Sequence, residues 1–589
     1  MFVKFYQGVC FSALLVFNTN YLQAQPFNIN GAVQEDREPE AATGITEKQA
    51  VRSKKFMVAA ANPYASKIGY NILAQGGSAI DAAIAVQLAL TLVEPQSSGI
   101  GGGAFILHWQ NKDKKLTTFD GRETAPALST SDLFLDKHGN AIPWIKAVVG
   151  GRSVGVPGVL AALKKAHEQY GKLPWEALFK DAINLAERGF RVSPRLEKLV
   201  EMQFNPGISE LPDIRRYFFP NGRGIKAGDK LRNPKLAQVY RSLSKEGIKP
   251  FYQGWIAEKI VSAVQESPIA PGRLSLNDMK NYQAVERGAV CGPYRFYKVC
   301  GMAPPSSGGI AVIQIMAQLE PFQLHKRALE DVQTSHLYTQ SSRLAFADRN
   351  RYIADSDFVD VPVEGLLSKN YLAERSKLIN IHQDMGQAQP GDPEGSLALA
   401  DDLAMELPST SHISIVDDEG NAVSMTTSVE MAFGSAVMVE GFILNNQLTD
   451  FSLSPKVNGK LVANRLEPLK RPRSSMAPMM VFEGDNLKLV VGSPGGSRII
   501  NYVAQTILAV LDWNLDPQQA INLPKITNRN KVTTLEKGTS ILDLKSGLEA
   551  KGHTISVRDL NSGIHAIEVK SIGLIGGADP RREGKVMGQ

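Results

Sequence analysis

Two short stretches of the sequence carry hydroxyl groups in a pattern that could build a nucleophile. Residues 412–417 and 422–427 each alternate polar and apolar side chains, which is typical of β-strands. The four residues between them, Asp-Glu-Gly-Asn at 418–421, predict a tight hairpin turn. If this turn is centred near Glu419, Thr410 and Ser428 face each other at the open end of the hairpin.

The same register divides the hairpin into a polar face and an apolar face, because side chains alternate along a strand. The polar face holds Thr410, His412, Ser414, Ser424, Thr426 and Ser428, and the apolar face holds Ile413, Ile415, Val423 and Met425. Two interpretations are open at this point. Either the polar face meets solvent, or the hydroxyls at its open end line a reactive site.

Thr410 would gain its own base if the chain were cut in front of it. A threonine hydroxyl is a weak nucleophile and needs a neighbouring base. Cleavage of the Ser409–Thr410 bond would leave a free α-amine on Thr410, with a pKa of about 7.7–8.0. Nucleophile and base would then belong to one residue, so this chemistry needs neither His nor Asp.

The elements around Thr410 can be outlined from the sequence. Residues 383–408 are rich in turn formers and carboxylates, which predicts a long exposed connection and a boundary near residue 409. Apolar periodicity predicts helices over 78–92, 158–170, 174–188, 234–246, 254–266 and 331–349. After the hairpin, a strand over 487–491 and a helix over 498–511 are expected.

Residues 99–104, Gly-Ile-Gly-Gly-Gly-Ala, match the G-x-G-x-x-A pattern of dinucleotide-binding loops. Such a loop follows a strand and opens a helix, whereas this one follows a predicted helix and precedes a strand-like segment, 105–109. The glycines therefore indicate close packing of backbone rather than a nucleotide site.

Composition narrows the class of protein. The chain has 589 residues, of which 43% are hydrophobic and 21% charged, so it can bury a large core. Disordered, fibrous and disulfide-stapled small proteins are excluded. The net charge of +6 is too small over this length to indicate a nucleic-acid partner.

Residues 1–24 have the form of an export signal. Lys4 precedes an apolar run at 9–17, which is too short to span a bilayer, and Ala24 suits cleavage by a signal peptidase. A membrane anchor is the alternative. Removal of this segment predicts a periplasmic or secreted protein without a stable membrane span. Residues 25–56 are mostly polar and are expected to be flexible.

Only Cys291 and Cys300 remain once the signal is removed. They could pair across neighbouring strands in an oxidising compartment, or be two small buried apolar residues. The histidines show no spacing typical of a zinc site, so neither a metal nor another cofactor is expected.

The chain resembles the gamma-glutamyltranspeptidases, which are N-terminal-nucleophile hydrolases. The resemblance rests on blocks that occur in order along nearly the whole mature chain. They are residues 76–83, 99–103, 121–126, 155–158, 304–309, 410–412, 445–451, 471–476, 492–498 and 578–581.

The resemblance implies an α+β fold, a four-layer αββα sandwich, formed jointly by two subunits after self-cleavage. The cut would fall between Ser409 and Thr410, giving a large subunit over 57–409 and a small one over 410–589. No other protein is implied as a partner beyond these two pieces of one precursor.

The resemblance also implies a reaction. Thr410 would attack the γ-carbonyl of a donor such as glutathione, and water or an amino acid or peptide acceptor would resolve the acyl-enzyme. Ser428 is the second hydroxyl, and the N–H groups of Gly495 and Gly496 would stabilise the oxyanion; a purely structural turn is the alternative for the glycines. Arg122, Ser474 and Ser475 would bind the α-carboxylate of the donor, and Gln447 and Asp450 its α-ammonium. Taken without the family, Arg122 and Asp450 could be ordinary surface ion pairs.

Three features depart from the family pattern. Glu430 stands where the family has asparagine, and its carboxylate would strengthen ammonium binding or repel an acidic head group. Ser428 replaces the usual threonine and keeps a hydroxyl with a freer side chain. The segment 451–473 is shorter than the tyrosine-bearing lid of some relatives, which predicts a more open site.

These departures leave other functions open. An acylase or amidase of the same fold, acting on poly-γ-glutamate or cephalosporin-type amides, is the closest alternative. A binding protein without catalytic activity is a second alternative, which the presence of Thr410, Arg122 and the two glycines disfavours.

Overall fold

The computed structural model describes residues 1, 44–402, 404, 407 and 409–589. The predicted signal peptide, apart from Met1, and the first part of the segment predicted to be flexible lie outside the described residues. Among the residues described, none of the helices is both long enough and apolar enough to cross a bilayer.

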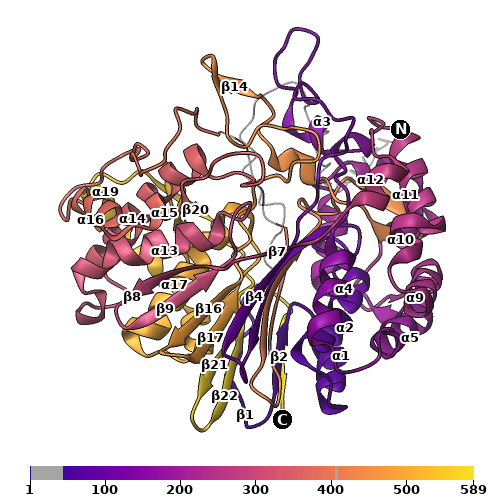
Figure 1. Cartoon of the computed structure of the whole chain (residues 1–589), viewed down its shortest axis with the longest axis horizontal. Helices are drawn as coiled ribbons and strands as arrows, with labels where there is room; N and C mark the ends of the chain where they lie inside the picture. Colours follow the sequence, from indigo (N-terminus) through magenta and orange to yellow (C-terminus); the bar gives the residue numbers. More distant parts are fainter. Residues whose placement is uncertain (2–43, 403, 405–406, 408) are drawn as a thin grey trace. The chain divides into compact units, whose positions relative to one another are not determined.

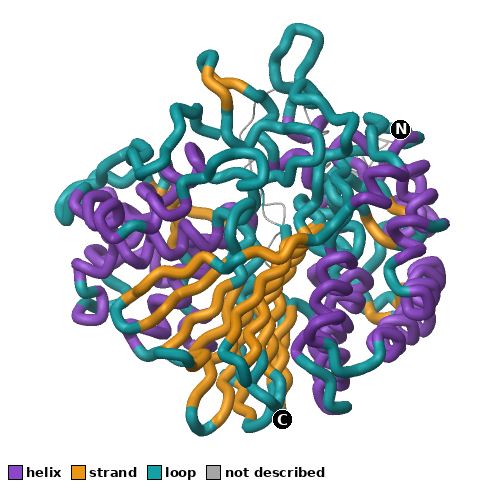
Figure 2. The backbone as a smooth tube through the Cα atoms, in the orientation of Figure 1, coloured by secondary structure: helices purple, strands orange, loops and turns teal. Residues whose placement is uncertain are grey.

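Two seven-stranded antiparallel sheets form the centre of the fold (Figures 1 and 2). The first sheet has the order β23 (Lys585–Gly588), β2 (Met57–Ala60), β10 (Ser411–Val416), β11 (Ala422–Ser428), β3 (Gly103–Gln110), β4 (Lys115–Gly121) and β7 (Val285–Arg287). The second sheet has the order β1 (Val51–Ser53), β22 (Gly573–Ala578), β21 (His565–Lys570), β17 (Asn486–Gly492), β16 (Met479–Glu483), β9 (Tyr297–Gly301) and β8 (Val290–Tyr294). Each sheet contains strands from both sides of the Ser409–Thr410 bond.

Helices cover the outer face of each sheet, which completes the four layers αββα (Figure 1). Next to the first sheet lie α1 (Pro63–Ala74), α2 (Ala79–Val93) and α4 (Val159–Tyr170). Next to the second lie α13 (Gly308–Leu319) and α17 (Ile499–Trp513), with α14 (Val332–Tyr352) packed on α13. The α+β sandwich implied by the resemblance is confirmed.

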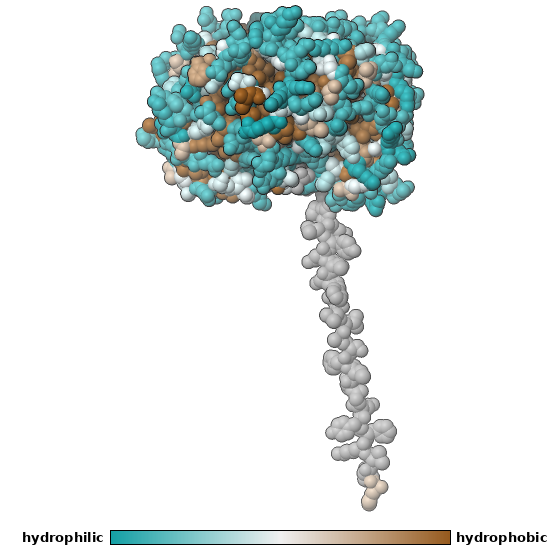
Figure 3. All heavy atoms as spheres, turned by 90° about the horizontal axis from the view of Figure 1, so that it is seen from below, coloured by the Kyte–Doolittle hydropathy of each residue, from teal (hydrophilic) through white to brown (hydrophobic). Residues whose placement is uncertain are grey.

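Shorter elements surround this centre. The further helices are α3 (Trp144–Val148), α5 (Lys180–Arg188), α6 (Pro194–Met202), α7 (Gly207–Glu210), α8 (Pro212–Phe218), α9 (Pro234–Glu246), α10 (Lys249–Gln253), α11 (Trp255–Gln265), α12 (Leu276–Asn281), α15 (Val363–Leu367), α16 (Lys369–Lys377), α18 (Pro517–Asn522) and α19 (Lys545–Ala550). The further strands are β5 (Phe190–Arg191), β6 (Lys230–Leu231), β12 (Met438–Val439), β13 (Phe442–Ile443), β14 (Lys456–Val457), β15 (Lys460–Leu461), β18 (Ile526–Asn528), β19 (Thr533–Glu536) and β20 (Ile555–Arg558). Polar side chains, in teal, dominate the face seen in Figure 3, with apolar side chains scattered between them.

The buried helix predicted over 78–92 is α2, and every residue of α2 is buried. Ser78 caps its first turn: the Ser78 hydroxyl accepts from the N–H of Asp81, and the Asp81 carboxylate accepts from the N–H of Ser78. The helix ends just before Pro95, which cannot continue it. Most other predicted helices are confirmed, but residues 174–188 form a 3-10 turn at Trp175–Phe179 followed by α5.

The hairpin of β10 and β11 has the predicted register, with Ser411 opposite Thr427 and His412 opposite Thr426. Its apolar face packs in one core with α2. The interpretation in which its polar face meets solvent is wrong, because this face is buried against the second sheet. The hydroxyl of Ser414 donates to the carbonyl of His565 at 3.1 Å, and that of Ser424 to the carbonyl of Val491 at 3.2 Å.

Gly101 and Gly102 pack against backbone, as predicted for the glycines of 99–103, whereas Gly99 and Gly103 face the side chains of Thr91 and Glu123. A Cβ on Gly101 would lie 2.2 Å from the carbonyl oxygen of Ile443, and one on Gly102 would lie 2.1 Å from that of Ser428. Side chains are therefore excluded where this loop passes the end of β11.

Part of the N-terminal segment that was predicted to be flexible forms a β-strand. The predicted flexible segment, 25–56, extends too far, because Val51–Ser53 forms β1 and pairs with Leu574–Gly576 of β22. Backbone pairing at a sheet edge orders these residues despite their polar character.

Cys291 and Cys300, opposite each other in β8 and β9, form a disulfide.

Candidate active site

Thr410 and Ser428 lie at the open end of the hairpin, beside the peptide bond that precedes Thr410. The Thr410 hydroxyl donates to the Ser428 hydroxyl at 3.4 Å, and the Ser428 hydroxyl donates to the carbonyl oxygen of Ser409 at 3.4 Å. All three residues are buried, with at most 3% of their surface exposed. One serine hydroxyl therefore connects the candidate nucleophile with the adjacent carbonyl.

The loop after α2 holds the residues on either side of Thr410. The Ser409 hydroxyl donates to the carbonyl of Gln96 at 2.9 Å. The Ser411 hydroxyl donates to Glu94 and accepts from Ser98, both at 3.1 Å. These contacts fix the backbone around Thr410 from both directions.

His412 is the nearest histidine to Thr410 along the strand, but its ring is engaged elsewhere. Its Nδ1 lies 2.8 Å from the hydroxyl of Thr426 and its Nε2 lies 3.0 Å from that of Ser414. Burial holds the pKa of His412 well below its ordinary value, with a smaller contribution from His565. Because both ring nitrogens are occupied, His412 is not available as a base for Thr410.

Arg122 and Asp450 form a buried ion pair with each other, so the interpretation of two separate surface ion pairs is wrong. Nη2 of Arg122 contacts the Asp450 carboxylate and donates to the carbonyl of Arg473 at 2.8 Å. Nε of Arg122 donates to the carbonyl of Pro472 at 3.1 Å, and the Gln447 amide donates to Asp450 at 3.4 Å. The cation expected to bind the α-carboxylate of a donor and the carboxylate expected to bind its α-ammonium thus lie together, and their charges neutralise each other.

Glu123 is buried behind Arg122, and one of its carboxylate oxygens lies 3.7 Å from Nη1 of Arg122. A Cβ on Gly103 would lie 2.2 Å from the same carboxylate, which shows how tightly Glu123 is packed. Burial raises the pKa of Glu123 to about 8, against a smaller lowering by Arg122. Glu123 lies within the matching block 121–126, but the sequence indicates no role for it, because its burial depends on segments distant in the chain.

Ser474 and Ser475 lie before β16, and their hydroxyls take part in hydrogen bonds. Ser475 accepts from Nη2 of Arg349 at 2.6 Å, and Ser474 accepts from the N–H of Met476 at 3.1 Å. Arg349 also donates to the hydroxyl of Ser307 at 2.9 Å. The sequence did not single out Arg349, which comes from α14, more than a hundred residues before the serines.

Glu430 links the second hydroxyl to the loop that carries Gln447 and Asp450. Its N–H donates to the Ser428 hydroxyl at 2.9 Å, with the backbone of Glu430 at a φ of 80°. The amide of Asn446 donates to its carboxylate. Asn446 lies within the matching block 445–451, but no residue pattern indicates a role for it.

Gly495 and Gly496 end the turn between β17 and α17, both with positive φ, 134° and 56°. A Cβ on Gly495 would lie 2.8 Å from the ring of Tyr502, so this position tolerates no side chain. A 3-10 turn, Gly496–Arg498, then leads into α17. This is the strand–turn–helix order expected for backbone donors at a helix start.

The connection before Thr410 passes directly beside the Arg122 pair. The Asp402 carboxylate accepts from Nη2 of Arg473 and from the amide of Asn464, both at 2.8 Å. The same Asn464 amide donates to the carbonyl of Asp450 at 2.7 Å. The expected exposed connection is therefore bound at Asp402, where opposite charge and amide donors are available.

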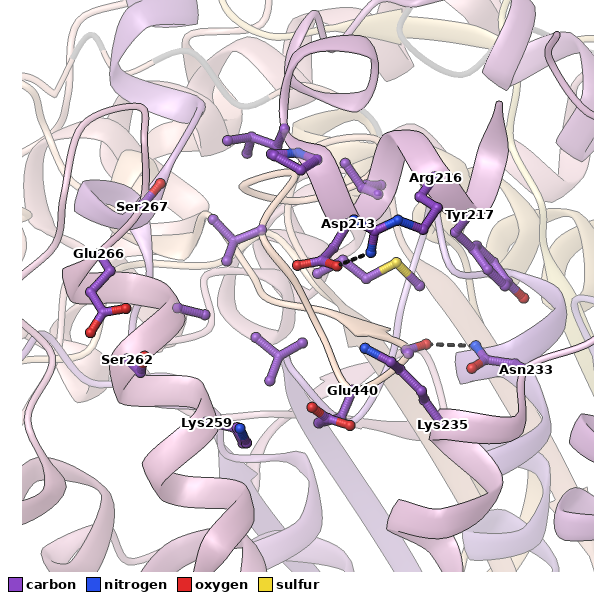
Figure 4. A pocket seen from close by; sticks show the side chains of 18 of the residues that line it. Asp213, Arg216, Tyr217, Asn233, Lys235, Lys259, Ser262, Glu266, Ser267 and Glu440 are labelled. Carbon is purple, nitrogen blue, oxygen red and sulfur yellow. Dashed lines mark hydrogen bonds and ion pairs between the residues drawn. The ribbon is translucent and has the colours of Figure 1, made fainter. Parts of the chain in front are cut away.

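A groove of about 570 Å³ lies elsewhere, between α8, α9, α11 and the β12–β13 hairpin (Figure 4). Charged side chains that line it include Asp213, Lys235, Lys259 and Glu440. None of the predicted site residues lines this groove. The chemistry inferred for Thr410 therefore does not take place there.

Taken together, these residues can support acyl transfer. A candidate nucleophile, a second hydroxyl and a paired cation and carboxylate come from segments on both sides of residue 409, and acyl transfer by this nucleophile requires no histidine base.

Comparison with known proteins gives matches along nearly the whole described chain. The family model described as Gamma-glutamyltranspeptidase matches residues 65–589. A glutathione hydrolase proenzyme of Bacillus subtilis (strain 168) is 38% identical over 562 residues, which cover 92% of this chain and 92% of that protein. A glutathione hydrolase proenzyme of Escherichia coli (strain K12) is 36% identical over 557 residues, covering 92% of this chain and 93% of that protein.

Among solved structures, cephalosporin acylase from Bacillus halodurans is similar with a TM-score of 0.82 and 29% identity. The similarity covers 94% of this chain and 99% of that one. The match of the family model and the relatives above 30% identity extend over nearly the whole described chain. The chain is therefore an enzyme that belongs to the gamma-glutamyltranspeptidase family.

Proposed function

We propose that this enzyme is an exported γ-glutamyl hydrolase and transpeptidase that becomes active by cutting itself before Thr410. The observation that carries the proposal is the contact of the Thr410 hydroxyl with Ser428, whose own hydroxyl reaches the carbonyl of Ser409. Glutathione is proposed as a donor because the relatives from Bacillus subtilis and Escherichia coli are glutathione hydrolases.

The first step is self-cleavage. The Thr410 hydroxyl attacks the carbonyl carbon of Ser409, its proton leaves, and the C–N bond breaks as the Thr410 nitrogen takes up a proton. Water then hydrolyses the resulting ester. The products are a carboxylate at Ser409 and an α-amine on Thr410, and the pieces are 57–409, with whatever precedes it, and 410–589.

The second step is transfer. The α-amine takes the proton of the Thr410 hydroxyl as its oxygen attacks the γ-carbonyl of the donor, and the N–H groups of Gly495 and Gly496 stabilise the oxyanion. The leaving amine takes the proton as the C–N bond breaks. Water or an acceptor amine then attacks the acyl-threonine and releases glutamate or a new γ-glutamyl amide.

The donor is oriented by its amino-acid head. Arg122, with the hydroxyls of Ser474 and Ser475, binds the α-carboxylate, and Asp450, Gln447 and Glu430 face the α-ammonium. Since Arg122 and Asp450 already pair with each other, the zwitterionic head would enter between them and replace one ion pair by two. A donor that lacks the ammonium would leave Asp450 unsatisfied.

An acylase acting on cephalosporin-type amides is the second candidate, favoured by the similarity to cephalosporin acylase. Release of product from a γ-glutamyl anilide, compared with a glutaryl anilide that lacks the α-amine, separates the two. Preference for the γ-glutamyl compound supports the transpeptidase. Preference for the glutaryl compound supports the acylase and contradicts the ammonium site.

Self-cleavage and export are tested together on the protein recovered from its host. Denaturing electrophoresis with N-terminal sequencing should give two pieces, the smaller one starting at Thr410 and the larger one lacking residues 1–24. The periplasm and the medium are both sampled. An intact chain, or a small piece with another first residue, would contradict the proposed mechanism.

A further inference from the structure

The ammonium group of Lys48 is enclosed by three backbone carbonyls of one turn near the C-terminus. Its Nζ donates to the carbonyl oxygens of Asp579 and Arg582 at 2.7 Å each and to that of Gly584 at 2.6 Å. Three carbonyl dipoles that point at one place repel one another unless a cation or several N–H donors lie between them. Lys48 supplies a cation and three N–H donors, so it stabilises the observed conformation of the turn formed by residues 579–584.

The segment that carries Lys48 is attached along this turn. The N–H of Thr46 donates to the carbonyl of Pro580 at 2.9 Å. A few residues later, β1 pairs with β22, the strand that leads into the turn. The family model begins at residue 65, so Thr46, Lys48 and β1 lie outside the matched region, whereas the turn and β22 lie within it.

The turn presents Arg582 to the nucleophile. The Arg582 side chain is buried, with 3% of its surface exposed, and its Nη1 donates to the carbonyl oxygen of Thr410 at 3.5 Å. Its Nε and Nη2 donate to the side chain and the carbonyl of Asn561, at 3.2 and 3.1 Å. The guanidinium thus connects the backbone of Thr410 with residue 561.

Gly563 lies between the side chains of Arg582 and Pro494, and Pro494 belongs to the glycine turn. A Cβ on Gly563 would lie 2.7 Å from Cδ of Arg582 and 2.5 Å from Cγ of Pro494. Arg582 and Pro494 therefore both border the space that a side chain at Gly563 would fill, and Pro494 directly precedes Gly495. A shift of Arg582 would be felt by the nucleophile and by the proposed oxyanion donors together.

We infer that Lys48 is a positioning residue for the Thr410 site, acting through the 579–584 turn and Arg582. The inference rests on the proposed function, in which Thr410 attacks and Gly495 and Gly496 stabilise the oxyanion. Without the ammonium, the three carbonyls turn toward water and the backbone that carries Arg582 moves with them. Such a small displacement changes the alignment of nucleophile and donors rather than the binding of the amino-acid head.

Electrostatics supports this role. Burial lowers the pKa of Lys48 to about 8, so at neutral pH the amine keeps its proton and all three N–H donors. Arg582 is cationic at every relevant pH. Next to Thr410 it disfavours the protonated form of the α-amine that cleavage would create, which keeps that amine available as a base.

The test replaces Lys48 with methionine, which has a similar length and no N–H donors, and uses Lys55→Met as the matched control. Lys55 is exposed in the same segment. With a γ-glutamyl anilide, Lys48→Met should lower kcat about tenfold and leave KM within about twofold, because the head-binding residues are held by other elements. Lys55→Met should match the wild type. An unchanged kcat in Lys48→Met, or a rise of KM without a loss of kcat, would overturn the inference.

A double-mutant cycle with Arg582→Met tests whether Lys48 affects kcat through Arg582. The Arg582→Met variant alone also keeps the Lys48 contacts intact. Arg582→Met alone should also lower kcat with little change in KM. Adding Lys48→Met to it should cause no further loss, since Lys48 acts through Arg582. Wild-type kcat in Arg582→Met, or losses that multiply in the double variant, would overturn the inference.

Thr410→Ala, assayed alongside, keeps this inference distinct from the proposed function. If Thr410→Ala retains activity, the proposed function fails. If Thr410→Ala is inactive while Lys48→Met equals the wild type, only the role of Lys48 fails.

Discussion

The hydroxyl of Ser428 contacts both the hydroxyl of Thr410 and the carbonyl of Ser409, the two groups that would react in the proposed self-cleavage. Its Oγ lies 3.4 Å from the hydroxyl of Thr410 and 3.4 Å from the carbonyl oxygen of Ser409. A hydrogen bond to that carbonyl makes its carbon more electrophilic, while the attacking oxygen is held nearby. The predictions for these two residues follow from this contact.

Thr410→Ala removes the attacking oxygen, so the chain should remain uncut and inactive. Electrophoresis should show one band, and a γ-glutamyl anilide should release no product above background. Thr410→Ser keeps the oxygen and should still be cut. Normal cutting of the alanine variant would assign the nucleophile to another residue.

Ser428→Ala should slow the cut about tenfold, because one hydrogen bond to the developing oxyanion is worth about 1.4 kcal/mol. Ser428→Thr restores the hydroxyl and should be cut at close to the wild-type rate. The measurement is the half-time of the conversion of purified precursor into two pieces. Equal half-times for the alanine and threonine variants would mean that this hydroxyl has no part in the reaction.

Asp450→Asn should abolish the preference for donors with an α-ammonium. A hydrogen bond between charged groups contributes about 1.5–3 kcal/mol, so kcat/KM for a γ-glutamyl anilide should fall about 10- to 100-fold. The value for a glutaryl anilide should change little, since that compound has no ammonium.

Asp401→Asn is the control for this experiment, because Asp401 pairs with Arg351 instead of Arg122. It should leave the ratio of the two kcat/KM values unchanged. An equal loss for both anilides in Asp450→Asn would show that Asp450 supports the structure without recognising the ammonium.

Glu123→Gln should remove a pH-dependent contribution to stability. Burial raises the pKa of Glu123 from 4.5 to about 8. Between these pH values the folded state holds a proton that the unfolded chain has lost, so the free energy of unfolding falls as pH rises. The fall is up to about 1.4 kcal/mol per pH unit; the contribution is fully present below pH 4.5 and is lost above pH 8.

Urea unfolding of wild type and Glu123→Gln at several pH values between 5 and 8 measures this contribution. The stability of the wild type relative to Glu123→Gln should decrease steadily across this range. Glu258→Gln, at an exposed position of α11, should follow the wild type. Parallel pH dependence of wild type and Glu123→Gln would mean that Glu123 is ionised in the folded protein.

The hairpin could be predicted in detail because its information is local. Alternation and one strong turn define both the register and the facing of Thr410 and Ser428. The helix α2 was predictable for the same reason, since Ser78 and Pro95 bound a continuous apolar run. The assignment of the residues that would bind the donor, from Arg122 to Ser475, came from motifs of the family and not from spacing.

The remaining features depend on contacts between distant segments. The polar face of the hairpin is buried because β17 and β21 pack against it. Arg122 meets Asp450 across 328 residues, and Lys48 meets Asp579 across 531. No local sequence pattern indicates which of several buried charges will pair. The Arg122–Asp450 ion pair and the Lys48 contacts could therefore be identified only from the three-dimensional structure.

The two central sheets each interleave strands from before and after residue 409. In the first sheet β10 and β11 lie between β2 and β3, and in the second β16 pairs with β9. If the chain is cut, neither product can leave without breaking several complete ladders of backbone hydrogen bonds. The products would therefore remain associated on dilution, and the activity per mole of enzyme would be the same at nanomolar and micromolar concentration.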